Sequence, residues 1–78
     1  MAAITIELSD ERIARLREVA QLCADADAER SGATTHGALT AEALLAMLAE
    51  DATFVIGRPG CWEAQDMATV LSAHGYEI

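Results

Sequence analysis

The hydrophobic period of the sequence changes near Ser9, and this change limits the folds open to the chain. From Ile4 to Leu8 apolar and polar residues alternate, which is typical of a strand with one buried face. From Asp10 onward the apolar residues follow the spacing of one helical face, at Ile13, Leu16, Val19/Ala20 and Cys23. Ser9 lies where its hydroxyl can accept a hydrogen bond from the first free helical amides. The pattern predicts a strand over residues 3–8 that leads directly into a helix over residues 9–30.

The predicted strand has no obvious partner within the chain. Because the helix starts immediately after it, no segment close behind can fold back as a hairpin, and its backbone groups still need hydrogen bonds. We therefore expect two copies of the chain to pair these strands antiparallel about a two-fold axis. Apolar side chains of both copies would form the core of this homodimer: Ile4, Ile6, Leu8, Ile13, Leu16, Leu44 and Leu48.

The composition also favours a dimer. The chain has 78 residues and 53% of them are hydrophobic, but only Phe54, Trp62 and Tyr76 are aromatic. Much of the remaining apolar content is alanine, which buries little surface. A single domain of this size would have a thin core as a monomer, and oligomerisation is a usual remedy.

The first residues resemble a known group of DNA-binding proteins. A strand, then Ser-Asp-Glu at 9–11, then Arg-x-x-Arg-Leu-Arg-Glu-Val-Ala at 12–20 is similar to the opening of the ribbon-helix-helix superfamily, which includes plasmid and phage repressors and antitoxins. The resemblance implies a mainly α fold with one short N-terminal strand. It also implies an intermolecular two-stranded antiparallel ribbon that enters the major groove of double-stranded DNA.

The resemblance further implies roles for individual residues. The outward side chains of the ribbon, Ala3, Thr5 and Glu7, would face the bases. The phosphate contacts would come from Arg12, Arg15 and the start of the second helix at Thr40 and Ala41, where free amides favour an anion. The implied function is a small transcriptional regulator or plasmid-maintenance protein.

The rest of the chain departs from the plain superfamily pattern. Residues 31–39 are rich in glycine and hydroxyl side chains and predict a long loop, where the superfamily has a short turn. A second helix is expected over 40–52, while residues 53–56 fit either a strand or the end of that helix. A turn at 57–60 precedes an added helix over 61–74. We expect Trp62 and Met67 of this helix to fill the core.

The charge leaves other functions open. The net charge is −8 and all five cations are arginines, whereas DNA binding needs clustered cations. One alternative is a protein-interaction module with the same fold, such as an antitoxin or acidic adaptor that binds a basic protein. Another is an all-helical dimer with no partner role visible in the sequence. The arginines could equally form a solvated face, with Glu11 and Arg15 as an i, i+4 pair.

The sequence offers no catalytic or metal-binding motif. No nucleophile and base are arranged for catalysis, so we expect neither an enzyme nor a cofactor. Residues 25–36 lack the glycine and glutamate of a calcium loop, and Cys23, His36, Cys61 and His74 lack zinc-site spacing. No signal peptide or membrane span is apparent, and two scattered cysteines fit a reducing cytoplasm.

Overall fold

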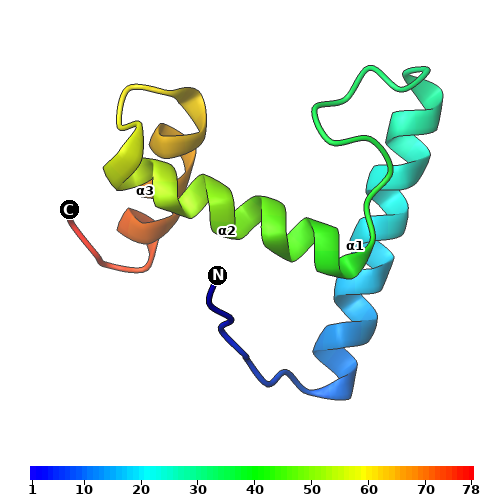
Figure 1. Ribbon diagram of the computed structural model, residues 1–78, viewed down its shortest axis with the longest axis horizontal. Coiled ribbons are helices and arrows are strands. Elements are labelled where there is room, and N and C mark those ends of the chain that lie inside the picture. Colours follow the sequence, from blue (N-terminus) through cyan, green and yellow to red (C-terminus); the bar gives the residue numbers. More distant parts are fainter. The chain divides into compact units, whose positions relative to one another are not determined.

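The protein is all-α. The computed structural model describes all 78 residues and contains three helices, α1 (Asp10–Glu29), α2 (Ala41–Gly57) and α3 (Trp62–Ala73) (Figure 1). It contains no strand. Residues 53–56, which the sequence left open between strand and helix, belong to α2.

The predicted ribbon-helix-helix fold, with its N-terminal strand and intermolecular ribbon, is therefore wrong, whereas the helix expected over 61–74 is present as α3. Residues 1–8 precede α1 without regular structure, and their backbone forms no hydrogen bond within the chain. Ile4 is 93% exposed and Ile6 is 63% exposed. The physical reason is that alternation defines one apolar face but provides no neighbouring strand. Because the helix begins immediately after this segment, no nearby strand can pair with it, and its backbone groups are solvated by water.

The chain divides into two compact units, residues 1–44 and residues 45–78, with the boundary inside α2. In the first unit the buried apolar residues are Ala20, Ala41 and Leu44, and in the second only Ala64 is buried. Three of these four residues are alanines, so each unit has a very small core. Burial of apolar area contributes roughly 25 cal/mol per Å², and alanine has little area to bury.

The first two helices begin at capping residues that the sequence indicates. The Ser9 hydroxyl accepts a hydrogen bond from the Arg12 amide at 3.2 Å, and the Thr40 hydroxyl accepts one from the Ala43 amide at 3.1 Å. Each bond satisfies one of the free donors in the first turn of a helix. Cys61 occupies the same position before α3, with an extended backbone, but its side chain forms no capping bond.

Two helices end in the same backbone motif with different residues. After α1, the Ser31 amide donates to the Ala28 carbonyl and the Gly32 amide donates to the Asp27 carbonyl. After α3, the Gly75 amide donates to the Ser72 carbonyl and the Tyr76 amide donates to the Leu71 carbonyl. This pair of bonds defines a Schellman motif, whose first residue beyond the cap is left-handed. That residue is Ser31 (φ 55°) after α1 and Gly75 (φ 96°) after α3.

Candidate interaction surfaces

The residues expected to contact DNA bases do not form a common surface on a ribbon. Ala3, Thr5 and Glu7 are exposed in the segment that precedes α1, and this segment is not paired with another strand. The element that was to present them to a major groove is therefore absent from the fold.

The expected phosphate contacts lie on two helices. Arg12 and Arg15 are exposed on α1. Arg15 Nη1 pairs with Glu18 Oε2 at 2.7 Å, whereas the sequence had indicated Glu11 as its partner. Both side chains of this ion pair are mostly solvated, so the pair contributes little to stability, but it reduces the positive charge that Arg15 presents.

The other two phosphate candidates, Thr40 and Ala41, line a small pocket of the first unit. Its lining residues are Arg17, Ala20, Gln21, Leu39, Thr40, Ala41 and Glu42. The structure thus adds Arg17, which the sequence reasoning missed, although this residue lies one helical turn before the buried Ala20. Glu42 contributes the opposite charge, so the charged side chains that line the pocket sum to zero. The Thr40 hydroxyl is already engaged in capping α2.

The residues expected to form a dimer core are largely uncovered in the single chain. Leu44 is buried, Leu8, Ile13 and Leu16 are partly buried, and the remaining three are exposed: Ile4, Ile6 and Leu48. The partly buried positions on α1 lie on the same helical face as Ala20. Apolar surface is therefore available for contact beyond this chain.

Trp62 is 62% exposed, although the sequence suggested that it fills a core. The buried and partly buried stripe of α3 contains Ala64, Met67, Ala68 and Leu71, which follow helical spacing. Trp62 precedes Ala64 by two positions and so lies about 160° away around the helix axis. The expectation for Met67, which is partly buried, agrees with the structure, whereas the one for Trp62 is wrong.

Trp62 is one of six large apolar side chains that the second unit exposes. They are Leu48, Ile56, Trp62, Val70, Tyr76 and Ile78. Singly exposed apolar residues are ordinary on protein surfaces, but tryptophan and tyrosine are enriched in the surfaces that bind other proteins. Tyr76 and Ile78 were not singled out from the sequence, because they lie beyond the periodic pattern of α3.

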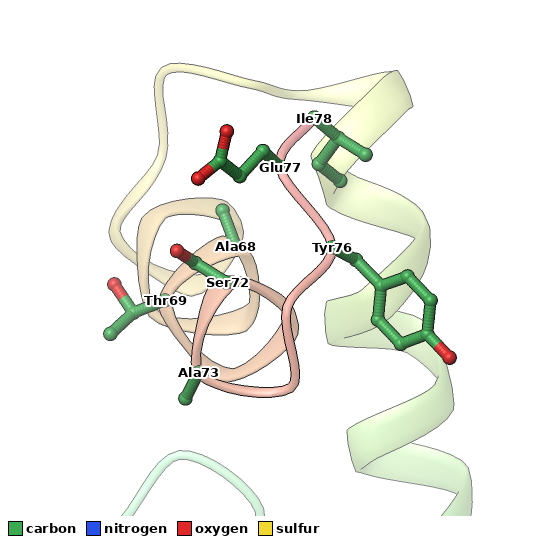
Figure 2. Close-up of a pocket in the computed structure, with 7 residues that line it drawn as sticks. All are labelled: Ala68, Thr69, Ser72, Ala73, Tyr76, Glu77 and Ile78. Atoms are coloured by element: carbon green, nitrogen blue, oxygen red, sulfur yellow. The ribbon is translucent and has the colours of Figure 1, made fainter.

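An open pocket lies between α3 and the residues that follow it. Ala68, Thr69, Ser72 and Ala73 line it from the helix, and it is completed by Tyr76, Glu77 and Ile78. Figure 2 shows the Glu77 carboxylate on the same side of the tail as the Ala68 and Ser72 side chains, with the Tyr76 ring on the other side. The pocket thus combines small side chains of α3 with one negatively charged side chain, Glu77.

The second unit is acidic. It contains five carboxylates and one arginine, and so has a net charge of −4. That arginine, Arg58, lies over the Phe54 ring with its guanidinium carbon 5.2 Å from the ring centroid. None of the five carboxylates forms an ion pair. The one ion pair of the chain, Arg15–Glu18, lies in the first unit. The unit therefore presents negative charge together with exposed apolar surface.

Comparisons of the chain with protein-family models, with curated proteins and with solved structures found no match. Within the structure, no group of three or more histidine, cysteine, aspartate or glutamate side chains is placed to hold a metal ion. None of the helices has both the length and the apolar character needed to cross a bilayer.

Proposed function

We propose that this protein is an interaction module that binds a basic protein partner through its second unit. The observation that carries the proposal is the exposure of Trp62 on a unit whose net charge is −4. Tryptophan and tyrosine are enriched among the residues that dominate binding energy at protein interfaces. A contact there would bury the Trp62 ring and place cations of the partner near the carboxylates.

The small cores support this proposal. Only four apolar residues are buried in the chain, whereas Ile56, Trp62 and Tyr76 remain mostly in water. A partner that covered these side chains would add apolar burial that the isolated chain lacks. Binding of this kind also stabilises the folded state by mass action.

DNA binding has less support than binding to a basic protein. The total charge of −8 opposes approach to phosphates, and the fold lacks the ribbon that was expected to enter a groove. A second copy of the chain is also less favourable as the partner, because it too carries −8. We place the protein in the cytoplasm, since both cysteines are free thiols.

Trp62 allows a direct test, because it is the only tryptophan in the chain. The probe is a synthetic amphipathic peptide of about 18 residues, long enough to form a helix, with leucines on one face and lysines on the other. We expect saturable binding with a blue shift of the Trp62 emission, weakened by added salt. The matched control is the same peptide with glutamate in place of lysine.

Two outcomes would contradict the proposal. One is an unchanged Trp62 emission at every concentration of the lysine peptide. The other is equal binding of the lysine and glutamate peptides, which would indicate unspecific apolar adhesion. Sedimentation of the protein alone tests for a second copy. If the mass is twice that of the chain and the Trp62 emission already indicates an apolar environment, the exposed surface is covered by self-association and not by a basic partner.

A further inference from the structure

We propose that the pocket between α3 and residues 76–78 receives a lysine or arginine side chain of the partner, with Glu77 as its counter-ion. This inference rests on the proposed function and names the part of the surface that would recognise the basic partner. The pocket is lined by four small residues of α3 and by Tyr76, Glu77 and Ile78 (Figure 2).

The backbone after α3 holds Glu77 beside the pocket. The Gly75 amide donates to the Ser72 carbonyl at 2.9 Å, and the Tyr76 amide donates to the Leu71 carbonyl at 3.0 Å. These two bonds turn the chain back along the last turn of the helix. Glu77 follows directly, so its backbone position is set by the helix end.

The lining residues fit the two parts of a cationic side chain. Ala68 and Ala73 offer apolar contact for the methylene stem, as lysine and arginine stems commonly require. The Glu77 carboxylate and the Ser72 hydroxyl oxygen can accept hydrogen bonds from the charged head. The Thr69 hydroxyl donates to the Gln65 carbonyl at 2.9 Å, which leaves its oxygen free to accept from a ligand.

Charge selects this occupant over others. No cationic side chain lines the pocket, and Glu77 has no ion-pair partner in the chain. An anionic group would meet the Glu77 carboxylate without compensation. An apolar side chain would displace water from that carboxylate and provide no hydrogen bond in return. A lysine or arginine side chain avoids both costs.

The test compares two variants that each remove one carboxylate from the second unit. Glu77→Gln changes the pocket, whereas Asp66→Asn changes an exposed carboxylate of α3 that does not line it. With the lysine–leucine peptide as probe, we expect Glu77→Gln to weaken binding about two- to fivefold, the range for a solvated ion pair. Asp66→Asn should change it by less than about twofold, the weaker effect of a charge outside the contact. Glu77→Lys should weaken binding further than Glu77→Gln.

Nuclear magnetic resonance locates the contact independently of affinity. Amide signals of residues 68–78 should shift on titration with the peptide, while those of α1 should not. Suppose that the wild-type chain binds the peptide and that Asp66→Asn weakens this binding as much as Glu77→Gln does. General charge attraction then explains the binding, the pocket assignment fails, and the proposed function stands. If the wild-type chain does not bind the peptide, the proposed function fails and the pocket assignment fails with it.

Discussion

The Thr34 hydroxyl donates a hydrogen bond to the Asp27 carboxylate, and this contact joins the loop between α1 and α2 to the end of α1. Both side chains are partly buried. The same hydroxyl oxygen accepts a hydrogen bond from the Gly37 amide at 3.1 Å. One side chain therefore connects the helix end to a loop residue with a left-handed backbone, Gly37 at φ 67°.

Thr34→Ala removes both of these bonds. We expect it to lower the free energy of unfolding by about 1–3 kcal/mol, because it leaves the Asp27 carboxylate and the Gly37 amide without their partner. Urea unfolding followed by circular dichroism measures the change. The control is Thr35→Ala, since Thr35 is exposed and its hydroxyl contacts only the neighbouring His36 ring. Equal stability of the two variants would show that the loop does not depend on Thr34.

Ser31 occupies a position that suits glycine better. Its backbone is left-handed, at φ 55°, in the motif that ends α1. We expect Ser31→Gly to raise the free energy of unfolding by about 0.5–1 kcal/mol, because relief of the left-handed backbone exceeds the added entropy of the unfolded chain. Thermal unfolding provides the measurement.

Gly75 provides the matched comparison for Ser31, since it holds the equivalent position after α3 with φ 96°. Gly75→Ala should lower the free energy of unfolding by about 1 kcal/mol for the same backbone reason. A stabilising effect of Gly75→Ala, or a destabilising effect of Ser31→Gly, would contradict the assignment of these two helix ends.

Cys61 leaves the start of α3 without a side-chain cap. Its extended backbone, at φ −82° and ψ 161°, is the conformation that capping residues adopt. We expect Cys61→Ser to stabilise the protein by about 1 kcal/mol, because serine can accept a hydrogen bond from the first turn. Cys61→Ala controls for loss of the thiol. If the serine and alanine variants unfold at the same urea concentration, no capping bond has formed.

The sequence predicted local structure better than it predicted contacts. The period of the apolar residues, together with capping at Ser9 and Thr40, indicated where α1 and α2 begin, because these signals act over one or two helical turns. The strand prediction failed because alternation from Ile4 to Leu8 says nothing about a neighbouring strand. The pocket at Glu77 was missed because it depends on how the chain turns at Gly75.

The helix α3 shows the same limit at a single side chain. Spacing placed Trp62 and Met67 on a helix, but two apolar stripes are compatible with that sequence. The covered stripe contains the expected Met67 together with Ala64, Ala68 and Leu71, whereas Trp62 lies outside it. Residue size alone therefore placed Trp62 on the wrong side of the helix.

Trp62→Ala separates a surface role from a core role. Because Trp62 is 62% exposed, we expect the free energy of unfolding to change by no more than about 0.5 kcal/mol, the usual range for surface substitutions. A tryptophan packed in a core would instead cost about 3–5 kcal/mol. The same variant should weaken binding to the lysine–leucine peptide by about 2 kcal/mol or more, the loss typical of a dominant interface residue. Isothermal titration calorimetry measures this loss without the tryptophan signal.

Val19→Ala is the control for Trp62→Ala, because Val19 is an exposed apolar residue of the first unit. It should leave both stability and peptide binding nearly unchanged. A large loss of stability in Trp62→Ala would mean that the ring is buried in the folded protein in solution. Sedimentation would then show whether a second copy of the chain buries it. A stable Trp62→Ala variant that binds the peptide as tightly as the wild-type chain would remove Trp62 from the interface. The measured stability and affinity together therefore determine whether the Trp62 ring contributes to folding or to binding the partner.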